Sequence, residues 1–155
     1  MPLEYWRSCR NLWCDYCFTG PAFAQFAAFV DSDASSSLRD HLAYVMSIAP
    51  RQAEPFALDM RPASSEQLYS IGLFYSVPRE DAAGVRRATE CHVRALNECM
   101  RLGGRPYLHG LWGGAGGLSR SQLAAFFGDE YERLNRVRSR VDPLGILNPF
   151  ALSAE

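Results

Sequence analysis

The chain has 155 residues, 48% hydrophobic and 21% charged, which is the composition of a globular protein rather than of a disordered tail. Its 16 basic and 17 acidic side chains leave a net charge of -1, which argues against nucleic acid or an anionic membrane as a partner. All the basic residues are Arg, so a P-loop lysine and lysine Schiff-base chemistry are excluded. At about 100–200 residues per domain, the length predicts a single domain over residues 1–155.

Residues 1–18 are aromatic but lack the apolar core of a signal peptide, because they carry Glu4, Arg7, Arg10 and Asp15. No stretch approaches the ~18 apolar residues of a membrane span. The five Cys are an odd number, which suits reduced thiols better than a disulfide framework. We therefore expect a cytoplasmic chain.

The first half of the chain is expected to begin with a strand and a helix. Residues 12–18 alternate, so that one strand face carries Leu12, Cys14, Tyr16 and Phe18. Gly20 and Pro21 break this strand, and apolar residues then recur at helical spacing over residues 23–30.

A polar loop over residues 31–37 is expected to lead into a second short helix, ended by Pro50, whose inward residues are Leu38, Leu42, Val45 and Met46. Strands are predicted at residues 56–60 and at residues 68–77, the second rich in Tyr, Ile, Phe and Val and closed by Pro78.

The second half begins with a long helix over residues 80–103, whose inner stripe is Val85, Ala88, His92, Ala95, Leu96 and Cys99. Residues 105–112 are predicted to be a strand, and the Gly-rich loop 113–117 leads into the last helix. Gly128 bends or divides that helix, and its buried face is Leu123, Phe127, Tyr131, Leu134, Val137 and Val141. The result is an α+β fold, with a mostly antiparallel sheet and helices packed on one face.

Two apparent motifs are weak. Cys9, Cys14 and Cys17 have the C-x4-C-x2-C spacing of iron–sulfur sites, but a fourth ligand would have to come from Cys91 or Cys99, both within a helical pattern. We expect these thiols to be small buried residues and predict no metal. The loop 113–117 lacks the third Gly of a dinucleotide fingerprint, because residue 119 is Ser, so a flexible turn is favoured.

The strand at residues 105–112 is the best candidate for a site. Its period of two places Arg105, Tyr107 and His109 on one face. Arg supplies a fixed cation, Tyr a phenol and His a proton acceptor near neutral pH, so the trio could bind an anionic or hydroxylated substrate. The alternative is a partly exposed polar sheet face without function. His41 and His92 lie in helical patterns and are interpreted as structural.

The C-terminal third resembles a known family. The segment FFGDEYERLNRVRSRVDPLGILNP (residues 126–149), after the strand that starts Arg105-Pro106-Tyr107, resembles the C-terminal end of FAD-linked oxidases of the vanillyl-alcohol-oxidase or PCMH type. The layout from Leu12 onward is similar to the substrate domain of cytokinin dehydrogenases, and berberine-bridge-type oxidases share a similar ending.

The resemblance implies that residues 1–155 are the substrate, or cap, domain of a flavin-dependent oxidoreductase. In this family an antiparallel sheet roofs the flavin, and FAD is held mainly by a separate N-terminal domain, which we expect to be absent here and supplied by a partner domain or subunit. The reaction would be hydride transfer to flavin from a C–H next to O or N of a small organic substrate. We expect the isolated chain to be inactive.

The resemblance also assigns residues. His109 and Tyr107 would be catalytic, Arg105 and Trp112 would bind substrate, and Asn148 would lie near the FAD. Arg105 and Pro106 match the Arg-Pro-His strand motif of sugar- and alditol-oxidising relatives, whereas Tyr107 stands where His is expected. Two alternatives remain: a free-standing α+β binding module that pairs by its sheet into a homodimer, and an inactive cap that regulates a full-length relative.

Overall fold

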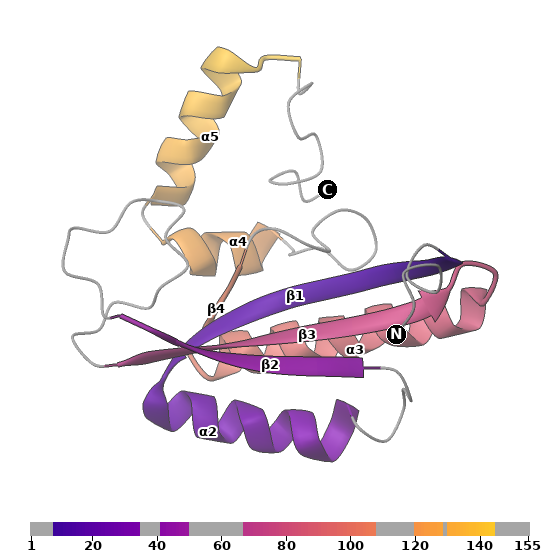
Figure 1. Cartoon of the computed structure of the whole chain (residues 1–155). Helices are drawn as coiled ribbons and strands as arrows, with labels where there is room; N and C mark the ends of the chain where they lie inside the picture. The colour runs from indigo at the N-terminus through magenta and orange to yellow at the C-terminus, as the bar shows by residue number, and fades with distance from the viewer. Residues whose placement is uncertain (1–7, 35–40, 50–66, 108–119, 129, 145–155) are drawn as a thin grey trace.

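The computed structural model describes residues 8–34, 41–49, 67–107, 120–128 and 130–144. The elements, in chain order, are β1 (Cys9–Thr19), α2 (Gly20–Phe29), the π-helical turn η1 (Val30–Ala34), β2 (His41–Ile48), β3 (Leu68–Pro78), α3 (Ala82–Arg101), β4 (Arg105–Pro106), α4 (Arg120–Phe127) and α5 (Glu130–Val141) (Figure 1). The predicted α+β class is confirmed. The strand predicted at residues 56–60 lies outside the described residues.

The strands form one four-stranded antiparallel sheet in the order β2-β3-β1-β4. The central pair, β1 and β3, is aligned over the full length of both strands, from Cys9 opposite Pro78 to Thr19 opposite Leu68. The described part of the strand predicted at residues 105–112 is β4, and the Tyr107 N–H continues its ladder by donating to the Asp15 carbonyl at 2.7 Å. Because directly opposed residues point to the same face, this register decides which side chains meet.

One face of the sheet carries the core. The predicted alternation in β1 is confirmed, since Leu12, Cys14, Tyr16 and Phe18 are all buried in one cluster with alternate residues of β3. Helices α2 and α3 cover this face (Figure 1), and the helical members of the cluster are Phe26, Val30, Ala88, Cys91, Ala95, Leu96, Cys99, Leu123, Phe127 and Tyr131. Every described α-helix therefore contributes to the same side of the sheet, as predicted.

The long helix α3 begins and ends where its sequence signals lie. The Asp81 carboxylate accepts a hydrogen bond from the Gly84 N–H at 2.8 Å, which satisfies a backbone donor that the first turn leaves free. Gly103, just past the end, has φ +70°, a left-handed conformation that glycine adopts without a Cβ penalty. Gly128, at φ +54°, separates α4 from α5, so the predicted interruption of the last helix is a complete break.

The prediction of a short helix with Leu38, Leu42, Val45 and Met46 inward is wrong over its described part, because residues 41–48 form strand β2. The same residues also fit a period of two, and Tyr44, Val45 and Ile48 favour a strand. Pairing with β3 over the whole of β2 outweighs the short helical pattern. Val45 and Met46 are 56% and 45% exposed rather than inward.

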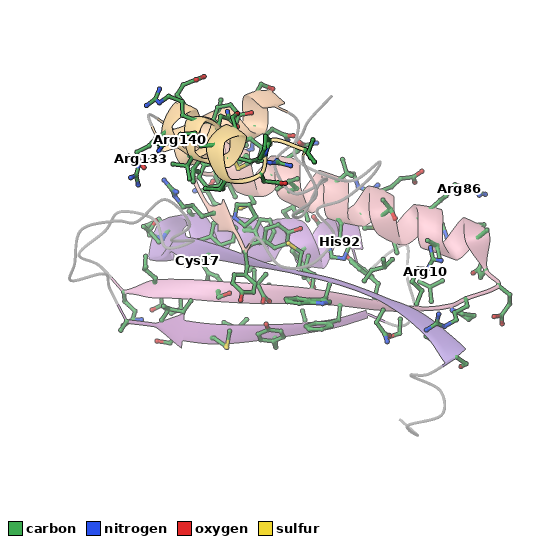
Figure 2. The ribbon with its side chains drawn as sticks, turned by 90° about the horizontal axis from the view of Figure 1, so that it is seen from above. Arg10, Cys17, Arg86, His92, Arg133 and Arg140 are labelled. Atoms are coloured by element: carbon green, nitrogen blue, oxygen red, sulfur yellow. The ribbon has the colours of Figure 1, made fainter. Side chains whose placement is uncertain are left out.

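The buried face predicted for the last helix extends further along the chain than the structure shows. Leu123, Phe127 and Tyr131 are buried, but Val137 and Val141 are 49% and 69% exposed. After the break at Gly128, α5 leads away from the sheet, so its last turns have no core to meet (Figure 1). Two of its arginines, Arg133 and Arg140, lie on the side of the molecule away from β2 and β3 (Figure 2).

Candidate functional site

The second face of the sheet, opposite the core, holds the candidate site. It is built from the residues of β1 and β3 that alternate with the core residues. Three rows cross the sheet in register: Phe74 and Trp13; Tyr44, Gly72, Asp15 and Tyr107; Met46, Ser70, Cys17 and Arg105. We call this set the second sheet face.

Four aromatic rings from successive strands make contact across this face. The ring centroids of Tyr44 in β2 and Phe74 in β3 are 5.6 Å apart. Phe74 stacks on Trp13 of β1, with 5.8 Å between their ring centroids and an interplanar angle of 9°. The ring centroid of Trp13 is in turn 6.2 Å from that of Tyr107, the residue that directly follows β4. Cross-strand aromatic pairs of this kind stabilise a sheet, and they also form a broad apolar surface with polar atoms at its two ends.

Asp15 lies beside this aromatic row. Its side chain is 7% exposed, and its Oδ1 accepts a hydrogen bond from the Tyr44 hydroxyl at 2.5 Å. The bond crosses β3 at Gly72, where a Cβ would overlap both the Tyr44 ring and the Asp15 carboxylate. Glycine at this position therefore provides the space that the Asp15–Tyr44 pair occupies.

The pair has a fixed direction of hydrogen bonding. Burial, and then the bond to Asp15, raise the pKa of the Tyr44 phenol above its ordinary value of 10. Tyr44 is therefore a neutral donor at physiological pH and Asp15 the acceptor. Within the described part of the chain no Arg or His forms an ion pair with Asp15.

A second polar group on the same face lacks a partner. The Ser70 hydroxyl is buried, with its residue 1% exposed, and its Oγ makes no hydrogen bond in the structure. Ser70 precedes Gly72 by two residues and lies on the same side of β3, so it is a diagonal neighbour of Asp15. Buried hydroxyls are nearly always hydrogen-bonded, so Ser70 is an exception on this face: a buried donor and acceptor that is left unsatisfied.

The structure places two of the predicted site residues here. Arg105 lies opposite Cys17, and Tyr107 lies beside Asp15, so both are on the second sheet face as the period of two predicted. His109, Trp112 and Asn148 lie outside the described residues. Asp15 and Tyr44 were missed as site residues, although an acidic residue inside an apolar strand was a signal for Asp15.

The core holds further ionisable groups whose pKa values are shifted, His92 and Cys14 among them. His92 sits between α3 and the sheet, in edge contact with Tyr75 at 4.8 Å (Figure 2), and burial lowers its pKa to about 4. Neither ring nitrogen of His92 has a hydrogen-bond partner of good geometry. The nearby backbone of Leu12 acts to raise the pKa of His92, but the opposite effect of burial is larger. The prediction that His92 is structural agrees with this burial, whereas His41 lies in β2 rather than in a helix.

The cysteines are also structural. All five are buried and none forms a disulfide, as expected for small apolar residues. Burial raises the pKa of the Cys14 thiol to about 12, so it stays protonated and unreactive. The residues that the structure describes contain no group of three His, Cys, Asp or Glu side chains able to hold a metal ion.

No protein-family model matches the chain, and no curated protein is significantly similar to it. Among the described helices, none has the length and apolar character needed to cross a membrane.

Proposed function

We propose that this chain is the substrate-binding, or cap, portion of an FAD-dependent oxidoreductase that oxidises a C–H next to O or N by hydride transfer to flavin. One observation carries the proposal: the antiparallel sheet has helices on one face and a polar, aromatic second face. The oxidases that the C-terminal third resembles use such a sheet to roof the flavin. The second sheet face would take that position.

The residues present fit a planar ring system. The contacting rings of Tyr44, Phe74, Trp13 and Tyr107 offer the flat, largely apolar surface against which an aromatic substrate or a flavin ring packs. The pyrophosphate of FAD would be held by an FAD-binding domain or subunit that pairs with this chain. When bound, the flavin supplies the hydride acceptor, which no side chain can provide.

This chain would position the substrate and take up its proton. The Asp15 carboxylate is the acceptor for a substrate O–H or N–H, and Tyr44 holds that carboxylate in place from its other side. Tyr107 lies next to Asp15, and Arg105, one row further, would contact an anionic or hydroxylated part of the substrate. By the resemblance, His109 and Trp112 would complete the substrate side, and Asn148 would approach the FAD.

The test is flavin co-elution. The purified chain is mixed with FAD, alone and with a separately expressed candidate FAD-binding domain, and flavin absorbance is followed through gel filtration. The proposal predicts co-elution, and substrate-dependent flavin bleaching, only when the partner is present. In that complex Asp15→Asn should lower the bleaching rate while flavin still co-elutes. Failure of every candidate partner to retain flavin would contradict the proposal.

The exposed edge strand β2 supports a second candidate function. Strand β2 is at the edge of the described sheet, and Val45 and Met46 on it are exposed. An apolar edge strand favours pairing with a second copy, as in a free-standing dimeric binding module without catalysis. Light scattering distinguishes the oxidoreductase portion from the binding module. A stable dimer that Val45→Lys converts to a monomer would favour the binding module, provided that the chain also retains no flavin under any condition.

A further inference from the structure

We propose that the second sheet face binds a small organic ammonium ion, a primary or secondary amine in its protonated form attached to an apolar group. This names the substrate class of the site in the proposed function, and its catalytic meaning rests on that function. The binding itself involves only residues of this chain, so it can be measured without flavin.

The Asp15 carboxylate has no balancing cation among the described residues. Asp15 is buried, and among the described residues its carboxylate receives one neutral hydrogen bond and no ion pair. A buried carboxylate is costly unless a cation or several donors compensate it. Tyr44 donates to Oδ1, and no other described residue donates a side-chain hydrogen bond to the carboxylate. A positively charged N–H donor is the group that best complements it.

Three aromatic residues neighbour Asp15 on the second sheet face. Tyr107 lies directly beside Asp15 on one side, Tyr44 lies beyond Gly72 on the other, and Trp13 is two residues away on the same face of β1. Aromatic rings within about 6 Å of a cation attract it through their electron-rich faces. Three such rings grouped around one carboxylate favour an organic cation over a neutral alcohol.

Ser70 offers the ligand a second hydrogen-bond acceptor beside Asp15. The buried Ser70 Oγ has no partner and is a diagonal neighbour of Asp15. An ammonium with at least two N–H groups can donate to Asp15 and to Ser70 together, whereas a quaternary ammonium can donate to neither. The apolar part of the ligand would lie on the stacked pair Phe74 and Trp13.

The experiment is calorimetric titration of the full chain with 2-phenylethylammonium and with its neutral analogue 2-phenylethanol. We expect the ammonium to bind at least about tenfold more tightly than the alcohol, because only the ammonium forms a charge-assisted bond to Asp15. Asp15→Asn, which keeps an acceptor for Tyr44, should lower the ammonium affinity at least about tenfold. The matched control is Asp31→Asn, an equal loss of charge at an exposed aspartate, which should leave the affinity unchanged.

Three outcomes would overturn the inference: equal affinity for ammonium and alcohol, equal loss in both variants, or preferential binding of phenylacetate that Arg105→Gln abolishes. The comparison of the two ligands on the unmodified chain needs no variant, so a misfolded Asp15→Asn protein does not remove the test. Because no flavin is present, failure here leaves the flavin co-elution result standing, and the reverse also holds.

Discussion

The two faces of the sheet are formed by alternate residues of the same strands, yet their chemistry differs. On the core face, Leu12, Cys14 and Tyr16 are closed off by helices. On the second sheet face, Trp13 and Asp15 contribute an aromatic surface and a carboxylate. Because the side-chain period of a strand is two, one segment can specify a core and a site independently.

The two faces also differ in the surroundings of their ionisable groups. In the core, burial raises the pKa of Cys14 and lowers that of His92, so both remain neutral and chemically inert. On the second sheet face, the Asp15 carboxylate accepts a hydrogen bond from a neutral donor, and its diagonal neighbour Ser70 has a buried hydroxyl that lacks a partner. The first face therefore holds the buried core, and the second holds the groups that the proposed function uses.

The largest expected effect is a cavity in the core. Phe26 is fully buried, with its ring 4.6 Å from Phe18 and 5.2 Å from Tyr16. Phe26→Ala should lower the free energy of unfolding by about 3–5 kcal/mol, measured by urea denaturation. Phe74→Ala on the second face should cost less, because that ring is only half-buried. Equal losses of unfolding free energy in the two variants would contradict the distinction between the two faces.

The next effect is a pH dependence from His92. Burial lowers its folded-state pKa from 6.5 to about 4, so between these values the unfolded chain binds a proton that the folded protein does not. Stability should therefore fall as the pH drops from about 6.5 to about 4, by about 3 kcal/mol in total. Denaturation midpoints at several pH values, compared with those of His92→Gln, isolate this contribution. An unchanged slope in the variant would show that His92 is not the cause.

A smaller effect is expected at Gly72. Gly72→Ala should displace Tyr44 from Asp15, because the new Cβ overlaps both, and should cost about 1–3 kcal/mol of stability. It should also weaken ammonium binding. Gly20→Ala is the matched control, since its Cβ would meet only Tyr69 Cε2 at an ordinary 3.7 Å. If both substitutions behave alike, the Asp15–Tyr44 pair does not depend on the space at Gly72.

The smallest effect is at the start of α3, away from the second face. Asp81→Ala removes the hydrogen bond to the Gly84 N–H and should cost about 1 kcal/mol of stability. Asp81→Asn keeps an acceptor and should retain most of that stability. Both variants should bind the ammonium ion as the unmodified chain does, which calorimetry checks. A loss of binding here would mean that affinity simply follows stability.

Much of the fold could be predicted because its periods are clear. The alternation at Leu12 to Phe18 predicts β1, and the six-residue inner stripe of α3 predicts that helix and its buried face. Strand β2 could not be predicted in this way, because its short apolar run fits both periods and only pairing with β3 decides between them. Val137 and Val141 continue a helical stripe that no partner element meets.

The candidate site could be predicted only in part. The placement of Arg105 and Tyr107 on one face follows from the strand period, which is a local property. The Asp15–Tyr44 pair joins residues 29 apart in sequence and depends on the register of three strands, with Gly72 between them. The sequence alone contains no local signal for that register, and Tyr44 lay in a segment predicted to be helical.

The most direct test measures unfolding free energy and ammonium affinity together at four consecutive residues of β1: Leu12→Ala, Trp13→Ala, Cys14→Ala and Asp15→Asn. Denaturation gives the first quantity and calorimetry the second. The account predicts that the two effects alternate, with the stability loss larger at Leu12 and Cys14 and the affinity loss confined to Trp13 and Asp15. Losses of affinity that follow losses of stability from residue to residue, without alternation, would contradict it.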